Sequence, residues 1–224
     1  VATLPNAQHP AAIGKDGEQI YAVRFLGDRG YVVTFRQSDP LYVLDLSNPA
    51  DPRSVGELQV PGFSDWLFPI DGSLLFGVGK DATAQGQVQG VKVALFDVHD
   101  ASSPKLLDSR SFGARGSSTA LDSSAHGLSL MVVGDTPNTT TRLALPMLLA
   151  PADIGLPAES LQRFEINSAA RSLLLKPAIA LGNGKVYTGS ENYQFDPTTN
   201  TFSTIPNMTV GSSRIVVDGG GNII

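Results

Sequence analysis

The feature of this sequence that most constrains its fold is a repeat with a fixed spacing. The stretch LYVLDLSNPADPR at residues 41–53 returns as VALFDVHDASSPK at residues 93–105. Asp45 therefore matches Asp97, and Pro52 matches Pro104, each 52 residues further along. A period of this size in a chain of short strands indicates β units that stack or are arranged around an axis, because one such unit cannot bury its apolar faces alone.

Each copy of the repeat has the same order of signals. A tight turn is followed by an apolar strand, a loop, a second apolar strand and a turn rich in Asp and Pro, first at residues 27–52 and again at residues 71–104. Matching Tyr31 to Leu75 gives an offset of 44 residues, against 52 for the Asp45 match, and this predicts an eight-residue insertion in the loop of the second copy. The apolar residues alternate or form short blocks between turns, which is typical of strands.

Weaker copies follow in the second half of the chain. A degenerate copy lies at residues 128–145, a further strand is expected at 161–166, and residues 158–164 are compatible with one helical turn. Asn183 and Gly184 give a strong hairpin signal, and residues 196–200 resemble the earlier turns. We predict an all-β fold, a β-propeller or partial propeller of about four antiparallel sheet units. Residues 1–224 would form a single propeller domain or a fragment of a larger propeller.

The recurrence of Asp residues in these turns has a local explanation. Asp and Asn side chains accept hydrogen bonds from backbone N–H groups two residues further on, and Pro fixes φ for the turn. Asp45, Asp97 and Asp196 are therefore expected to form turns rather than to bind a ligand.

Composition excludes several classes of function. The chain carries 16 basic and 21 acidic residues, a net charge of −5, without a basic run, so a nucleic-acid partner is not expected. It has no Cys, which excludes disulfides, thiolate metal sites and a Cys nucleophile. No apolar run reaches the roughly 20 residues that span a bilayer, so no membrane span is expected.

Several stretches resemble a known family. Residues 20–36 and 39–41, with residues 61–65, 77–81, 90–92 and 142–146, are similar to the bacterial and archaeal secreted β-propeller family that is described as distantly related to WD40 repeats. The resemblance implies an exported propeller, at the cell surface or in the periplasm, without established catalytic chemistry. Family members are longer than this chain. They often carry an aromatic-Asp-His stretch, where this chain has ALDSSAH at residues 120–126 with changed spacing.

Candidate binding residues come from loops and strand ends. Trp66 is the only Trp of the chain, and with Phe63 and Phe68 it forms an expected aromatic cluster beside Asp65 that suits core packing or, in a central channel, ligand binding. Asp81 lies in a polar loop, and His126 lies in the stretch that departs from the family pattern. The predicted binding residues are Phe63, Asp65, Trp66, Asp81 and His126; no catalytic residue is predicted.

Calcium is the most plausible ion for loops that supply hard oxygen ligands. The loop carboxylates are Asp81, Asp100, Asp135 and Asp196. None shows the residue order of a dedicated calcium loop, so solvated turn carboxylates are the favoured interpretation and no other cofactor is expected.

Three functions are compatible with these observations. The first is an exported, non-enzymatic binding or scaffold module that presents loops to a protein or glycan. The second is a metal-assisted hydrolase, lactonase- or esterase-like, that uses the central channel. The third is a structural subunit of a larger assembly, in which the rest of the parent polypeptide or another chain completes the propeller. Converging carboxylates around an ion would favour the second. An uncovered sheet edge beside Ile223 and Ile224, or such an edge paired with a second polypeptide, would favour the third.

Overall fold

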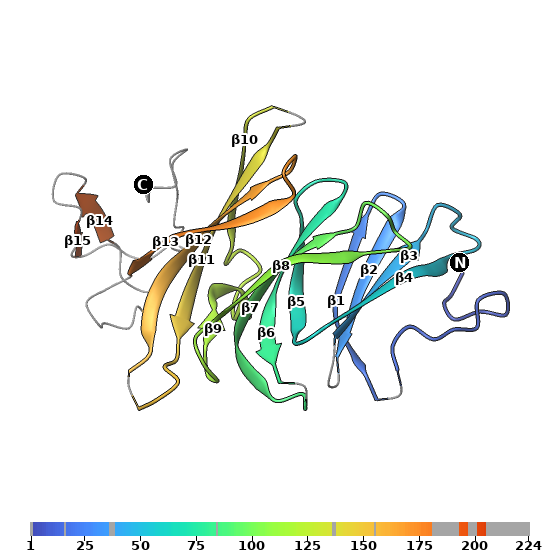
Figure 1. The fold of residues 1–224 in the computed structure, drawn as a ribbon, viewed down its shortest axis with the longest axis horizontal. Helices are drawn as coiled ribbons and strands as arrows, with labels where there is room; N and C mark the ends of the chain where they lie inside the picture. The colour runs from blue at the N-terminus through green and yellow to red at the C-terminus, as the bar shows by residue number, and fades with distance from the viewer. Residues whose placement is uncertain are drawn as a thin grey trace.

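The structure is a computed structural model, and it describes residues 2–15, 17–35, 39–83, 85–135, 138–154, 156–180, 193–196 and 201–204. Three antiparallel sheets of four or five strands follow one another along the chain (Figure 1). A two-stranded sheet comes after them. In the part of the chain that is described, the one helix is a 3-10 turn, η1 (Ala120–Asp122).

The strand order within each sheet follows the sequence. The first sheet contains β1 (Gln19–Leu26), β2 (Arg29–Phe35), β3 (Asp39–Asp45) and β4 (Arg53–Val60), and the second contains β5 (Phe63–Pro69), β6 (Leu74–Ala82), β7 (Val88–Asp97) and β8 (Lys105–Phe112). The third contains β10 (Ser129–Val133), β11 (Thr140–Leu149), β12 (Ala158–Asn167) and β13 (Ser172–Ala180), with the short β9 (Ser118–Thr119) paired to β11 beside β10. The last pair is β14 (Tyr193–Asp196) and β15 (Thr201–Thr204).

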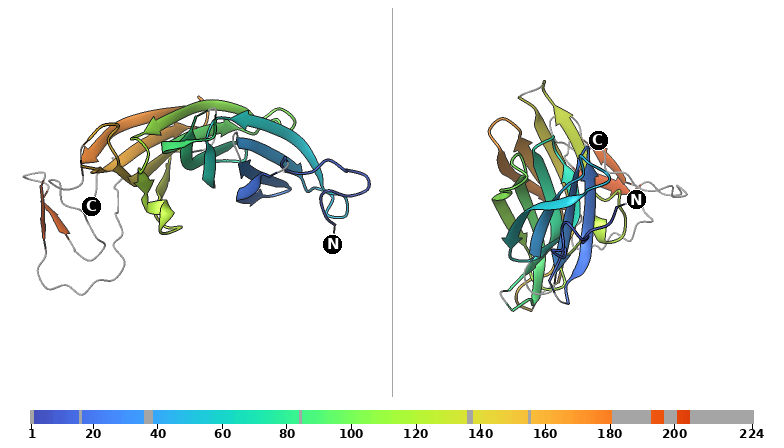
Figure 2. Two further views of the ribbon diagram at one scale, coloured as in Figure 1. Left: turned by 90° about the horizontal axis from the view of Figure 1, so that it is seen from below. Right: turned by 90° about the vertical axis from the view of Figure 1, so that its right-hand side faces the viewer.

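The three sheets are arranged along an arc. Figure 2 shows β1, β5 and η1 on the concave side of this arc, and the last strands of the sheets on its convex side. Each sheet therefore runs from the inside of the arc to the outside, as the blades of a propeller do. The described residues form a partial β-propeller.

Two apolar cores join neighbouring sheets. The first inter-sheet core contains Tyr31 and Val43 from the first sheet, and Leu67 and Phe96 from the second. The second inter-sheet core contains Phe76 and its neighbours from the second sheet and, from the third, residues that include Leu145, Phe164 and Ile166. Because each sheet buries its faces against its neighbours, the repeat unit depends on adjacent units, as the sequence predicts.

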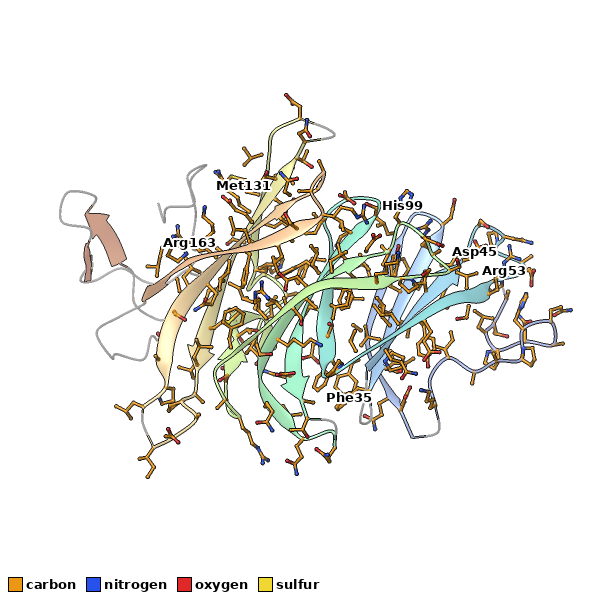
Figure 3. All side chains as sticks on the ribbon, in the orientation of Figure 1. Phe35, Asp45, Arg53, His99, Met131 and Arg163 are labelled. Atoms are coloured by element: carbon orange, nitrogen blue, oxygen red, sulfur yellow. The ribbon has the colours of Figure 1, made fainter. Side chains whose placement is uncertain are left out.

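The turns after β3 and β7 contain the same hydrogen bond, which confirms the repeat. The Asp45 carboxylate accepts from the backbone N–H of Ser47 at 3.0 Å, and the matching Asp97 carboxylate accepts from the N–H of His99 at 2.9 Å. A bulge interrupts the pairing of β3 with β4 between Val43 and Leu44, and the equivalent bulge interrupts β7 and β8, also 52 residues on. Figure 3 places Asp45 beside Arg53, whose guanidinium bonds it at 3.1 Å.

Close approach of the first two sheets requires a glycine in β4. A Cβ on Gly56 would lie 2.1 Å from the carbonyl oxygen of Ala101, in the turn that precedes β8. The first sheet therefore lies against the backbone of the second without an intervening side chain at this point.

Two predictions need correction. Arg29 pairs with Asp45, and Leu74 pairs with Asp97, so the offsets are 45 and 52 residues and the loop insertion is seven residues, not eight. Matching the two copies of the repeat by sequence overlooked one residue, because the β5–β6 turn is one residue longer than the β1–β2 turn. The helical turn proposed within residues 158–164 is wrong, because β12 runs through it as a paired strand.

The fourth predicted unit is covered only in part. Residues 183–188, which hold the Asn-Gly hairpin signal, and the turn after Asp196 lie outside the described residues. In the described residues no helix is long and apolar enough to cross a bilayer.

Candidate functional site

Matching bulges on the two innermost strands mark the candidate site. The pairing of β1 with β2 shifts between Ile20 and Ala22, and the pairing of β5 with β6 shifts between Ser64 and Trp66. The extra residues are Tyr21 and Asp65, which occupy equivalent positions 44 residues apart. Bulges re-aim a side chain locally and are frequent next to functional sites. Both residues lie on strands of the concave side (Figure 2).

Among the described residues, Asp65 has the most strongly shifted pKa. Burial raises the pKa of the Asp65 carboxyl from 3.8 to about 6, the Lys80 charge opposes this rise, and the Asp122 charge adds to it. Desolvation disfavours the charged form of a carboxyl group, which is why burial dominates here. Asp65 therefore changes its charge within the physiological range of pH.

Lys80 and Asp122 form an ion pair between the second and third sheets. The Nζ of Lys80, near the end of β6, lies 2.7 Å from an Asp122 carboxylate oxygen and donates to the carbonyl of Ser117 at 3.2 Å. Asp122 is the last residue of η1, where its carboxylate also accepts from the backbone N–H of Thr119. The Thr119 hydroxyl in turn caps the η1 turn by accepting from Leu121 at 3.2 Å. This reciprocal capping holds Asp122 in place for Lys80.

The interruption of the third sheet's inner edge explains why Asp122 lies there. Residues 120–128 leave the sheet between β9 and β10, which both pair with β11. Figure 2 shows η1 projecting on the concave side. The stretch that departs from the family pattern is thus the segment that brings a carboxylate to Lys80.

Three aromatic rings lie at the same end of the first two sheets. The Phe63 ring lies 4.4 Å from that of Phe35 and 4.6 Å from that of Tyr21, between ring centroids. Figure 3 places Phe35 at the end of the molecule opposite to His99 and Met131. Tyr21 is exposed, so one ring of the group faces solvent.

The predicted cluster around Trp66 divides into two parts. Trp66 stacks on Phe68 with centroids 6.3 Å apart, and both pack against the second inter-sheet core. Phe63 instead joins Tyr21 and Phe35. Trp66 therefore has a packing role, and Phe63 belongs to the aromatic group of the site.

Asp81 and His126 are placed away from these contacts. The Asp81 carboxylate accepts from the Ser111 hydroxyl at 2.8 Å and from the N–H of Ala82 at 3.0 Å. His126 is exposed, and its backbone N–H donates to the Ser124 hydroxyl. Among the residues with described side chains, no group of three or more His, Asp or Glu could hold a metal ion.

Sequence reasoning missed Tyr21, Lys80 and Asp122. The match of Tyr21 to Asp65 within the repeat was a usable signal for the first of them. The spacing of Thr119 and Asp122, which is that of a capping box, was a usable signal for the turn. No local signal pairs Lys80 with a residue 42 positions away.

We call Asp65, Lys80, Asp122 and the rings of Tyr21, Phe35 and Phe63 the concave site. With Asp65 ionised, its three charged groups sum to −1, and with Asp65 protonated they sum to zero. A carboxylate beside aromatic rings can bind a cationic group by charge and by cation–π attraction. The Lys80 ammonium already has a partner, so the site as a whole favours a cation.

Comparisons with known proteins agree with the architecture. The family model described as "Beta propeller domain" matches residues 7–164. An uncharacterized protein of Methanocaldococcus jannaschii is 47% identical over 92 residues, which are 41% of this chain and 14% of that protein. An uncharacterized protein of Archaeoglobus fulgidus is 56% identical over 88 residues, 39% of this chain and 13% of that protein. The matched part thus spans about a seventh of each relative.

Proposed function

Because the chain belongs to the beta propeller domain family, we propose that it is a non-enzymatic binding and scaffold module whose ligand occupies the concave site. The partner is a protein segment that presents a Lys or Arg side chain. The observation that carries this proposal is the partly buried Asp65 on a bulge of an innermost strand, at the position equivalent to the bulge that carries the exposed Tyr21 ring on the neighbouring sheet.

The charge of the site supports a cationic partner over a neutral glycan. Asp65 loses solvation where it lies, and its burial raises its pKa to about 6. A ligand cation would restore the interactions that the ionised carboxylate lacks, and its aliphatic stem would pack on the Tyr21 ring. The net charge of −5 on the whole chain attracts such a partner at low ionic strength.

A peptide array tests this proposal. The probes are immobilised peptides that contain Lys or Arg, matched peptides with norleucine or citrulline in their place, and a neutral glycan array. We expect binding to the cationic peptides, and a loss of about tenfold in affinity with Asp65→Asn or Tyr21→Ala, as for truncation of an interface hot spot. Asp100→Ala, at the turn that precedes β8, is the control and should leave binding unchanged.

Two results would contradict the proposal. Peptide binding that survives both Asp65→Asn and Tyr21→Ala would place the ligand elsewhere. Binding to neutral glycans alone, sensitive to the same variants, would keep the site and replace the protein partner by a glycan.

A hydrolytic activity is the second candidate, and the raised pKa of Asp65 is what favours it. A carboxyl group with a pKa of about 6 suits general acid–base chemistry near neutral pH. Hydrolysis of p-nitrophenyl acetate and of simple lactones, followed between pH 4 and 8, tests this candidate. An activity that rises around pH 6 and disappears in Asp65→Asn would support it, and rates equal to those of buffer would reject it.

The proposed location is outside the cytoplasm, at the cell surface or in the periplasm. The resemblance to secreted propellers supports this location. Fractionation of the native cells with an antibody against the chain tests it, and recovery with cytoplasmic markers would reject it.

A further inference from the structure

The turn between β10 and β11 contains an acceptor sequence for an N-linked glycan. Asn138 is followed by Thr139 and Thr140, and this modification requires Asn-x-Ser/Thr with a residue other than Pro in the middle. Asn138 is exposed and lies just before the start of β11. Figure 1 shows the hairpin of β10 and β11 at the upper margin of the molecule, where a glycan has room in solvent. A second acceptor sequence, at residues 207–209, lies outside the described residues.

Hydrogen bonds fix the backbone on both sides of Asn138. Its N–H donates to the carbonyl of Asp135 at 2.8 Å. The hydroxyl of Thr139 donates to the Ser168 hydroxyl at 3.1 Å, and the Ser168 N–H donates to the Thr139 carbonyl at 3.0 Å. Ser168 belongs to the turn between β12 and β13. The exposed Asn138 side chain therefore leaves the surface from a defined point.

The strand that leads to this turn exposes apolar side chains. β10 has the sequence SLMVV, without a charged residue. Leu130, Val132 and Val133 are 43%, 54% and 36% exposed. Among the described strands, β10 pairs with β11 alone, so the N–H and C=O groups along its other edge are available to another strand. An exposed apolar edge of this kind favours unwanted pairing between molecules.

The innermost strands of the other two large sheets have features that oppose such pairing. β1 has a bulge at Tyr21 and carries Arg24, and β5 has a bulge at Asp65 and ends at Pro69. Bulges, charged side chains and Pro are common protections of edge strands. The pairing of β10 with β11 has no bulge, and β10 contains neither a charge nor Pro. The strand that lacks these protections thus leads directly to the acceptor sequence.

We propose that Asn138 carries an N-linked glycan and that this glycan covers the exposed edge of β10. The donor is an oligosaccharide joined to a lipid through a phosphate or pyrophosphate. The side-chain nitrogen of Asn138 forms a bond to the anomeric carbon of the first sugar and loses one proton to solvent. The bond from that carbon to the phosphate oxygen breaks, and the lipid phosphate leaves with the electron pair. Because such acceptors are used on surface loops of secreted proteins, this proposal rests on the proposed location outside the cytoplasm.

The register of the hairpin brings the glycan close to the exposed side chains. Val133 pairs with Thr140, which is two residues after Asn138. From Val133 to Leu130 the strand extends about 10 Å, at roughly 3.3 Å for each residue. An oligosaccharide of several sugars spans this length, and it is bulky and hydrated. It would keep a strand of another molecule away from β10.

Mass spectrometry of the natural polypeptide, purified from its native cells at full encoded length, tests the modification. Trypsin cleaves after Arg115 and Arg142 and releases residues 116–142 as one peptide, in which Asn138 is the only Asn. We expect this peptide to carry a sugar mass that fragmentation assigns to Asn138.

Matched controls separate the acceptor sequence from mere exposure. Asn167 pairs with Thr140 but is followed by Ser168 and Ala169, so it should stay unmodified in the peptide of residues 164–171. Thr140→Ser keeps the acceptor sequence and should keep the glycan, whereas Thr140→Val and Asn138→Gln should abolish it.

The covering of β10 has a separate readout. The natural polypeptide and Asn138→Gln are compared by size-exclusion chromatography and by the fluorescence of the hydrophobic dye ANS. We expect the associated fraction and the dye signal to rise about twofold or more in Asn138→Gln, because an apolar patch is uncovered. Adding Val132→Lys to Asn138→Gln should reverse this rise, since it places a charge on the edge strand.

The outcomes distinguish the modification from the proposed location. An unmodified Asn138 in protein that fractionates outside the cytoplasm would overturn the glycan and leave the location as proposed. Recovery with cytoplasmic markers would reject both. A glycan on Asn138 whose removal changes neither association nor dye binding would overturn the covering of β10.

Discussion

The ionisation of Asp65 has a consequence for stability that can be worked out in sign and size. In the unfolded chain the carboxyl group ionises near its usual pKa of 3.8, and in the folded chain it ionises near 6. Below about pH 3 both states are protonated, and the group has no net effect on stability. As the pH rises from about 3 to about 7, the unfolded state ionises first, so the free energy of unfolding falls; above about pH 7 both states are ionised and the loss is complete.

The shift sets an upper limit on the size of this loss. One pKa unit corresponds to about 1.4 kcal/mol, which gives about 3 kcal/mol for the full shift. Asp65 is partly exposed, and solvent screening reduces this to about 1–2 kcal/mol. Asp65→Asn keeps the shape and removes the charge. We therefore expect it to stabilise the protein by about 1–2 kcal/mol at pH 7.5 and to change little at pH 4.

Urea unfolding at a series of pH values measures this effect. Trp66, the single Trp of the chain, reports unfolding by fluorescence. Because Asp65 is next to Trp66 in the sequence, circular dichroism is used as a second probe that does not depend on Trp66. Asp100→Ala is a control of opposite sign, because hydrogen bonds from the Ser102 hydroxyl and N–H lower the pKa of Asp100. Its loss should destabilise the protein at neutral pH and have less effect in acid. A stability difference between Asp65→Asn and the natural protein that is equal at pH 4 and pH 7.5 would refute the reasoning.

Three further predictions concern packing and charge. Phe164→Ala should lower the free energy of unfolding by about 3–5 kcal/mol, because the ring is buried between two other aromatic rings, and a loss below 1 kcal/mol in urea unfolding would contradict this. Gly56→Ala should cost about 1–3 kcal/mol in the same assay, since the new Cβ would meet the Ala101 carbonyl oxygen at 2.1 Å; an unchanged stability would show that the sheets can move apart freely. Lys80→Gln should raise the pKa of Asp65 further, because the Lys80 charge lowers it. A carboxyl NMR titration in which the pKa of Asp65 stays the same or falls would show that the Lys80 charge does not act on Asp65.

The parts of the fold that depend on neighbouring residues could be predicted from the sequence. Asp45 and Asp97 form the same turn because their hydrogen bonds reach only two residues ahead. The spacing of these turns then fixes the order of strands, and the short apolar blocks identify the buried strands β2 and β7. The all-β class and the partial propeller follow from such local signals.

The candidate site could be predicted only in part, because its contacts join distant segments. Asp65 was identified beside a tryptophan, but its raised pKa depends on burial that no local pattern encodes. Phe63 was grouped with Trp66 as a sequence neighbour, whereas its ring partners come from the first sheet. Lys80 meets Asp122 only because the third sheet's inner strand is interrupted between β9 and β10. The position of each bulge determines which of these side chains come into contact, and the residues around it give no signal that predicts it.

Because residues 120–128 leave the edge of the third sheet, the number of ligand-binding sites differs from the number of sheets. A chain of equivalent units would offer equivalent sites, and occupancy would grow with the number of units. Among the three larger sheets that the structure describes, only the second has both an acidic bulge and a carboxylate that its neighbour supplies. Titration calorimetry should therefore give one bound ligand for these three sheets and not three.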